Sequence, residues 1–105
     1  MRINLIIKRH WFDEIRAGRK TKEYRETTDR LAKQICNFGE TDDEFCEVLS
    51  FKPITEILFL NGYNKNRPTM LVECVGIDIE TETDEQGNYN VFVFSLGKIL
   101  KIENC

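Results

Sequence analysis

Three charged residues that lie close together in the sequence, Lys20, Glu23 and Arg25, have types and spacing suited to chemistry. Side chains two positions apart share one face of a strand, so Glu23 and Arg25 are expected to lie side by side. Glu23 can accept hydrogen bonds and exchange a proton, whereas Lys20 is a compact cation and Arg25 a planar fork of donors. Such a set suits a ligand that has both donors and acceptors, such as a nucleobase edge beside a phosphate.

Two other interpretations of this cluster remain open. In the first, Glu23 neutralises Arg25 or Lys20 in a salt bridge, but exposed pairs contribute only about 0–1 kcal/mol, so we favour a ligand site. In the second, the cluster is catalytic, with Glu23 as a general base toward water and the two cations stabilising an oxyanion. Thr21 supplies a hydroxyl nearby. His10, the only histidine, is expected at a helix end rather than in a catalytic triad.

The elements that position the cluster follow from the spacing of apolar residues. The pattern predicts a strand from about Ile3 to Ile7, a helix from about His10 to Ala17 and a strand from about Thr21 to Glu26. Gly18 stands where a left-handed residue would end the helix. Two neighbouring aromatic residues of the helix, Trp11 and Phe12, are expected in the core.

A second helix is predicted to begin at the segment Thr27-Thr28-Asp29, whose side-chain oxygens can accept from the amides of the first turn. Gly39 is expected to end this helix. The acidic stretch from Glu40 to Glu47 has no period and predicts an exposed loop or an irregular insertion. The apolar stripe of the helix consists of Leu31, Ala32, Ile35 and Cys36.

Three further strands are predicted in the second half of the chain. The first runs from Thr55 to Leu60 and ends at a turn, the second from about Thr69 to Ile79 and the third from Val91 to Gly97. Sequential strands with two helices in the N-terminal half predict an α+β, barrel-like single domain over residues 1–105.

The loop between the first two of these strands combines an aromatic ring with two cations. Such a loop could stack a base on Tyr63 and hold phosphate with Lys65 or Arg67, and a polar hairpin loop without a ligand is the other interpretation. A folded position of the Tyr63 ring against the sheet is the simpler expectation.

The order Gly18-x-Lys20-x-x-Glu23-x-Arg25 after an aromatic helix resembles the ASCH domain family, whose name abbreviates activating signal cointegrator homology. The segments 57–63 and 70–77 are similar to barrel strands of that family, and 91–97 is similar to its closing strand. The resemblance covers most of the chain and is weakest from Cys36 to Phe51. It implies a PUA-like small β-barrel.

The resemblance also implies two kinds of activity. Most members are RNA-binding or nucleic-acid-associated modules, which implies RNA or a nucleotide-like small molecule as the ligand. The site residues are then Lys20, Glu23, Arg25, Tyr63, Lys65 and Arg67. A small bacterial branch of similar length hydrolyses the amide of N4-acetylcytidine with a Lys, a Thr and a Glu; its Lys matches Lys20, but Glu23 stands in place of its Thr.

An amidohydrolase acting on a modified nucleoside is therefore an alternative function, with Lys20, Glu23 and Thr21 as the candidate catalytic residues. A protein-interaction module that uses the acidic segment from Glu40 to Glu47 is a second alternative. We expect no cofactor.

The charge of the chain is unevenly distributed. Residues 1–35 hold ten Lys or Arg and five Asp or Glu, whereas residues 36–105 hold five and thirteen, within a net charge of −3. Such asymmetry can create a local positive field that attracts phosphate although the whole chain is acidic.

Four cysteines show neither C-x-x-C spacing nor a neighbouring histidine pair, so no metal site is expected. Cys74 is predicted to be a small buried side chain in an apolar strand. No stretch approaches the roughly 20 apolar residues of a membrane-spanning helix, and the amino terminus is typical of a strand rather than a signal peptide. We therefore expect a cytoplasmic protein that does not enter a membrane.

Overall fold

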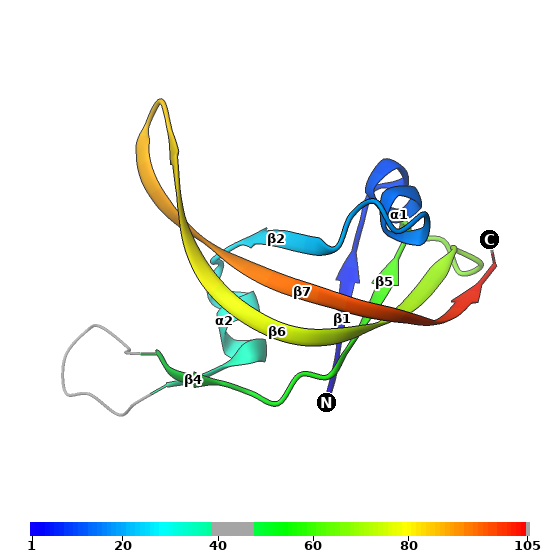
Figure 1. Cartoon of the computed structure of the whole chain (residues 1–105), viewed down its shortest axis with the longest axis horizontal. Coiled ribbons are helices and arrows are strands. Elements are labelled where there is room, and N and C mark those ends of the chain that lie inside the picture. The colour runs from blue at the N-terminus through cyan, green and yellow to red at the C-terminus, as the bar shows by residue number, and fades with distance from the viewer. Residues whose placement is uncertain (39–47, 105) are drawn as a thin grey trace.

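A five-stranded mixed sheet carries the fold in the computed structural model, which describes residues 1–38 and 48–104 (Figure 1). The strand order is β1-β5-β6-β7-β2; β1 and β5 are parallel, and all other neighbours are antiparallel. The strands are β1 (Arg2–Ile6), β2 (Lys22–Glu26), β5 (Glu56–Leu60), β6 (Thr69–Asp84) and β7 (Gly87–Glu103).

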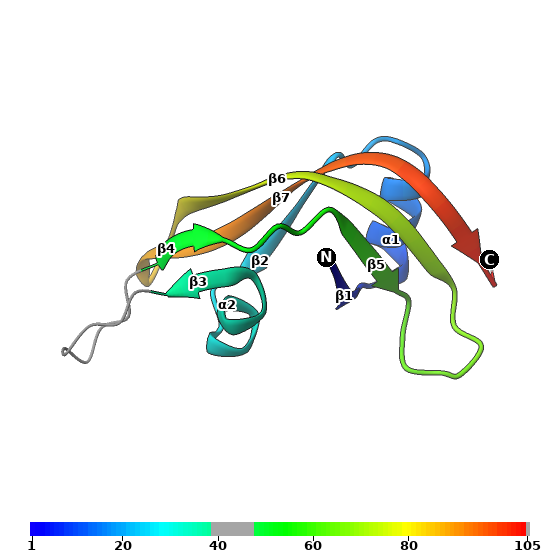
Figure 2. The same ribbon diagram turned by 90° about the horizontal axis from the view of Figure 1, so that it is seen from below.

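The sheet is strongly curved, and its two edge strands do not pair with each other (Figures 1 and 2). The guanidinium of Arg25 in β2 nevertheless donates a hydrogen bond of 2.9 Å to the carbonyl of Ile6 in β1. A side chain therefore bridges the two edges where a closed barrel would have backbone hydrogen bonds. The predicted α+β class is confirmed, but no closed barrel is found in the described part of the chain.

The first helix, α1 (Arg9–Arg16), buries Phe12 and Ile15 and ends as the sequence predicted. Gly18 has a φ of +78°, and its amide donates to the carbonyl of Ile15. The next amide, that of Arg19, donates to the carbonyl of Glu14. This pair of hydrogen bonds forms a Schellman motif, which turns the chain sharply from α1 toward β2.

The second helix, α2 (Asp29–Ile35), begins at the predicted cap, where the hydroxyl of Thr28 accepts from the amide of Leu31 at 3.2 Å. The prediction that the helix continues to Gly39 was wrong, because Cys36 already has extended backbone angles and starts β3 (Cys36–Phe38). β3 pairs with β4 (Val48–Phe51), so inter-strand hydrogen bonds replace those of another helical turn. The predicted loop from Glu40 to Glu47 lies outside the described residues.

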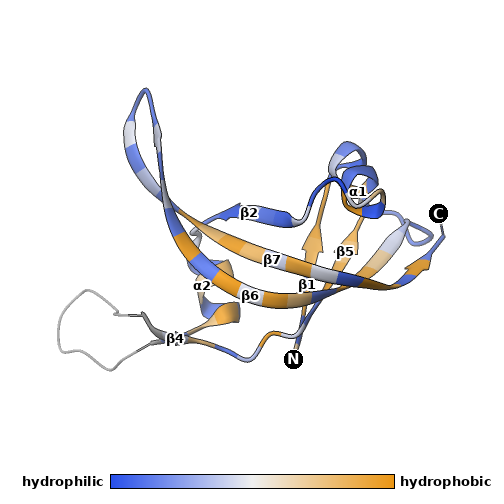
Figure 3. Ribbon diagram, viewed as in Figure 1, coloured by the Kyte–Doolittle hydropathy of each residue, from blue (hydrophilic) through white to orange (hydrophobic). Residues whose placement is uncertain are grey.

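The core lies between the concave side of the sheet and the two helices, and apolar residues dominate the central strands (Figure 3). Fully burying one large apolar side chain contributes about 1.5–3 kcal/mol. The largest fully buried side chains are Phe12, Ile35, Ile57, Phe59, Met70, Val72, Phe92 and Phe94.

β6 and β7 are longer than the sequence predicted and extend past the core as a hairpin arm, residues 80–90 (Figure 1). The predicted strand ends at Ile79 and Gly97 were wrong, because the β6–β7 pairing reaches Asp84 at one end and Glu103 at the other. The apolar alternation stops where the arm leaves the core, but the ladder of backbone hydrogen bonds does not. No helix in residues 1–38 or 48–104 is long and apolar enough to span a membrane.

Candidate functional site

A groove of about 790 Å³ lies between the unpaired edges of β1 and β2, and we call it the seam groove. Residues 4–6 of β1, with Ile7 directly after it, line one side, and residues 23–26 of β2 line the other. Trp11 from α1 and Arg30, Leu31 and Gln34 from α2 also line it, together with Lys8 and Thr28. The groove therefore follows the line along which the sheet fails to close.

Glu23 is the one charged residue that is buried in the part of the chain the structure describes, with a side chain 9% exposed. Its backbone pairs with Phe94, a fully buried residue of β7, so its side chain belongs to the inward face of the sheet. Burial of a carboxylate is costly unless the charge is paired and hydrogen-bonded. The ion pairs and hydrogen bonds of the Glu23 carboxylate therefore determine whether it can still bind a ligand.

Two cations balance the charge of Glu23 without satisfying its hydrogen-bonding capacity. The distance from Arg25 Nε to Glu23 Oε1 is 3.3 Å, and that from Lys20 Nζ to Glu23 Oε2 is 4.0 Å. Neither Glu23 Oε2 nor Arg25 Nε has a hydrogen-bond partner in the described part of the protein, although both atoms are buried. Since buried polar atoms are nearly always hydrogen-bonded, the carboxylate is poised to accept from an incoming donor.

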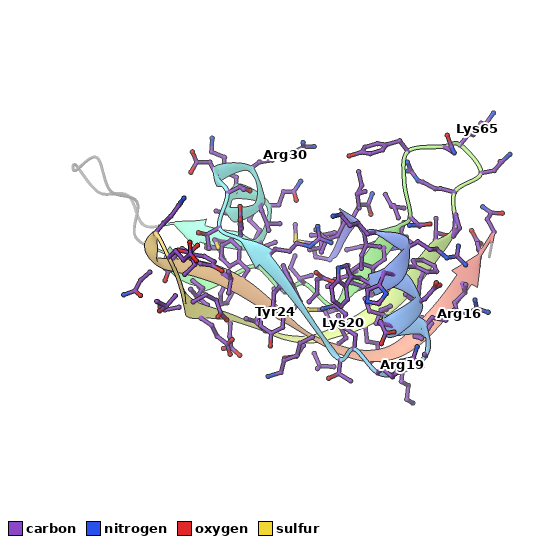
Figure 4. The ribbon with its side chains drawn as sticks, turned by 90° about the horizontal axis from the view of Figure 1, so that it is seen from above. Arg16, Arg19, Lys20, Tyr24, Arg30 and Lys65 are labelled. Carbon is purple, nitrogen blue, oxygen red and sulfur yellow. The ribbon has the colours of Figure 1, made fainter. Side chains whose placement is uncertain are left out.

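Lys20 also lies against two aromatic rings beside the groove. Its ammonium is 5.2 Å from the ring centre of Trp11 and 5.6 Å from that of Tyr24, within the range of cation–π contacts. Figure 4 labels Lys20 and Tyr24, which lie close together in that view. Lys20, Glu23 and Arg25 therefore converge, as the sequence predicted, with two aromatic rings around them.

The prediction that Trp11 is a core residue was wrong, whereas that for Phe12 is confirmed. Trp11 is 47% exposed and lines the seam groove, and Phe12 is fully buried. Adjacent helical residues point about 100° apart, given 3.6 residues per turn, and α1 docks so that Phe12 faces the core while Trp11 faces the groove. Tyr24 is similarly half exposed, at 46%, and was not a predicted site residue. Its place in the strand beside Glu23 was the signal that could have identified it.

The other predicted site residues lie away from the cluster. Thr21 is exposed and does not line the seam groove, and its backbone carbonyl accepts from the amide of Leu96. Tyr63 was expected to fold onto the sheet, which was wrong, because its side chain projects from the β5–β6 loop and is 82% exposed. Lys65 and Arg67 line a separate hollow that shares no residue with the seam groove.

Nearby charges outside the groove are paired with each other. Arg19 contacts the carboxylate of Glu14 through two of its nitrogens, at 2.8 and 3.0 Å. The hydrogen bond from Arg19 lowers the pKa of Glu14, and its partner carboxylate raises the pKa of Arg19. His10 is exposed, and its ring contacts that of Trp11 at 4.6 Å between centres.

Cys36 and Cys74 are buried, and the thiol of Cys74 donates a hydrogen bond of 3.5 Å to the carbonyl of Gly76. Cys74 is buried in β6, as predicted, and burial raises the pKa of its thiol. Burial likewise raises the pKa of the Cys36 thiol. A cluster of three or more potential metal ligands is not found among residues 1–38 and 48–104.

Comparisons of the chain with protein-family models, with curated proteins and with solved structures find no significant match. The chemistry of the seam groove is therefore argued from its own residues.

Proposed function

We propose that this protein is a PUA-like domain of the ASCH type that binds RNA or a nucleotide-like ligand in the seam groove. Lys20, Glu23 and Arg25 contact the ligand. The observation that supports this most is the carboxylate of Glu23, which is buried and charge-balanced but has an oxygen without a hydrogen-bond partner among the described residues. The proposal includes a cytoplasmic location, where RNA and nucleotides are available.

The chemistry of Glu23 limits which bases fit. An ionised carboxylate only accepts hydrogen bonds, so the ligand atom that meets it must be a donor. The amino group of cytosine is such a donor, and carboxylates recognise cytosine in this way in other complexes. Uracil carries a carbonyl oxygen at the same place, so we expect cytidine to bind more tightly than uridine.

The remaining groups of the site fit the rest of a nucleotide. Lys20 and Arg25 are placed to contact a base carbonyl or a phosphate oxygen, because both lie next to Glu23. The half-exposed rings of Trp11 and Tyr24 can stack on a base, an interaction worth about 1–3 kcal/mol per base.

The test is an amide NMR titration of the labelled protein with cytidine, its 5′-monophosphate and uridine. We expect cytidine to shift the resonances of residues 20–26 and of Trp11, and uridine to shift them less. The isosteric Glu23→Gln variant, which replaces half of the acceptor by a donor, should lose the preference for cytidine. Unchanged spectra with every nucleoside and nucleotide would overturn the base site.

The alternative of an amidohydrolase rests on the closeness of Lys20 and Glu23, whose charged atoms are 4.0 Å apart. A water activated by Glu23 could then attack the amide of N4-acetylcytidine. This alternative is weakened because Glu23 stands where the similar enzymes have a Thr. Thr21, like Lys20, is not among the residues that line the groove. Incubation with N4-acetylcytidine decides it, because hydrolysis releases cytidine and acetate in equal amounts, whereas a binding protein releases neither.

A further inference from the structure

Two more hollows continue the seam groove across the surface. The first has a volume of about 560 Å³ and shares Asn4, Ile6, Arg30 and Gln34 with the seam groove. The second, of about 420 Å³, shares Arg2 and Leu60 with the first and reaches the β5–β6 loop and the end of β7. Because each hollow shares residues with the next, the three adjoin one another, and we call this series of hollows, from Glu23 past β1 to the β5–β6 loop, the depression.

Basic side chains line this depression along its whole length. Among residues 1–38 and 48–104, six of them form no ion pair with an acid, and we call them the basic track. In order from the seam groove they are Lys8, Arg30, Arg2, Lys52, Lys65 and Arg67. Two further basic lining residues, Arg25 and Lys101, are paired with Glu23 and Glu103.

Acidic residues are sparse along the depression. Its described lining contains only Glu23, Glu26 and Glu103, and the middle hollow contains none. In contrast, Glu80, Glu82, Asp84 and Glu85 gather on the hairpin arm. In Figure 4, Arg30 and Lys65 both lie along the upper border of the molecule, on the side away from Arg19. This separation gives an acidic protein a positive surface.

We propose that the basic track binds the sugar-phosphate backbone of single-stranded RNA, one base of which enters the seam groove at Glu23. A row of unpaired cations is complementary to regularly spaced phosphates, and each neutralised phosphate releases counterions. A single strand is required because only an unstacked base can present its edge inside a groove. The placement of the base rests on the proposed function, whereas the contact with the backbone rests on the charge of the track alone.

The test compares three proteins in fluorescence anisotropy with a labelled oligocytidylate. Its length of about 12 nucleotides lies within the ~4–16 nucleotides that small single-strand-binding folds cover. The first protein is the wild type, and the second is the variant Arg2→Gln/Arg30→Gln/Lys65→Gln, which removes one exposed cation from each region of the track. The third is a control with the same charge change outside the track, Lys22→Gln/Lys33→Gln/Lys98→Gln; all six side chains are exposed.

We expect the track variant to bind about 10–100-fold more weakly than the wild type at low salt. Between about 50 and 200 mM salt, its slope of log affinity against log salt should be less steep by about 2, or about 0.7 for each lost phosphate contact. The control should keep the slope of the wild type. If the track variant behaves like the control, the proposal that the basic track binds the RNA backbone is wrong. NMR shifts with cytidine would in that case still support the base site at Glu23.

Two further outcomes separate the two proposals. RNA binding that depends on the three track cations, in a protein that gives no shifts with nucleosides, would support the track and overturn the base site. If inorganic polyphosphate displaces the RNA at equal phosphate concentration, the surface recognises negative charge alone. That result would contradict RNA as the specific ligand of the basic track. Circular dichroism and thermal melting of all three proteins establish that they are equally folded.

Discussion

Losing Arg25 and losing Glu23 should have unequal effects on the stability of the protein. Glu23 is almost completely buried, whereas the side chain of Arg25 is 26% exposed and also donates to the carbonyl of Ile6. Removing the arginine leaves a buried carboxylate with Lys20, 4.0 Å away, as its remaining cation. Removing the carboxylate leaves two cations whose side chains are partly exposed, 18% for Lys20 and 26% for Arg25.

We therefore expect Arg25→Met to destabilise the protein by about 3 kcal/mol, the lower end of the range for breaking a buried ion pair. Glu23→Gln removes a charge but keeps the shape, and we expect it to cost less than about 1 kcal/mol. The measurement is the free energy of unfolding of the two variants and the wild type in urea. Equal losses from the two substitutions would show that Glu23 is held by the ion pair and has no spare capacity for a ligand.

At this scale the sequence predicted the charged cluster but not the aromatic rings beside it. Strand alternation is a local rule, so it placed Glu23 and Arg25 on one face correctly. The exposure of Trp11 depends on how α1 docks on the sheet, and that of Tyr63 on where the β5–β6 loop points. Neither is set by neighbouring residues. The ligand roles of the cluster stay a prediction.

The end of α1 sets the direction in which Lys20 enters the site. Gly18 adopts a φ of +78°, and a Cβ built on it would meet no atom within 4 Å. The requirement for glycine there is therefore conformational and not steric. Gly76 in β6 has equally open space without a positive φ, so it provides a matched comparison.

We expect Gly18→Ala to destabilise the protein by about 1–2 kcal/mol, the cost of a left-handed conformation for a residue with a Cβ. Gly76→Ala should be neutral or stabilising by up to about 1 kcal/mol, because a glycine within a strand loses more conformational freedom on folding. Thermal or urea unfolding of both variants measures the difference. Similar effects from the two substitutions would contradict the Schellman ending of α1.

The order of the elements was predictable, but their lengths and one strand pair were not. Gly18 identified the end of α1 and Thr28 the start of α2, because such signals act within one turn, whereas Gly39 did not mark the end of α2. The β3–β4 pair joins residues 36–38 to residues 48–51, so its hydrogen bonds are not visible in either segment alone. The hairpin arm has polar residues on both faces, and such a strand has no apolar period to reveal it.

The hairpin arm contributes no buried residue to the core, but it contributes negative charge to the molecule. None of residues 81–90 is buried, although all of them except Glu85 and Gln86 in the turn pair in the β6–β7 ladder. Their three acids, Glu82, Asp84 and Glu85, add negative charge to a protein that we propose to bind a polyanion.

Replacing residues 81–90 by a two-residue Asn-Gly turn should leave the free energy of unfolding within about 1 kcal/mol of the wild type, because no core residue is lost and the hydrogen bond from the Thr27 hydroxyl to the Asn90 carbonyl is exposed. We expect RNA affinity to rise, and to rise more at low salt than at high salt, as long-range repulsion is screened. The variant Glu82→Gln/Asp84→Asn/Glu85→Gln keeps the whole arm but removes its acids, so it distinguishes the effect of the arm's charge on affinity from the effect of its length. Anisotropy and thermal melting measure both effects, and a fall in affinity would assign the arm to the binding surface.

The unpaired seam between β1 and β2 has a practical consequence for finding the ligand. A ligand bound there would contact both free edges. Because the unfolded chain has no such site, the ligand would bind the folded state alone. Such a ligand adds about 2.7 kcal/mol to the free energy of unfolding at a concentration one hundredfold above its dissociation constant. The folding equilibrium thus reports on occupancy directly, and a collection of nucleosides and nucleotides can be ranked by the melting temperature each one gives.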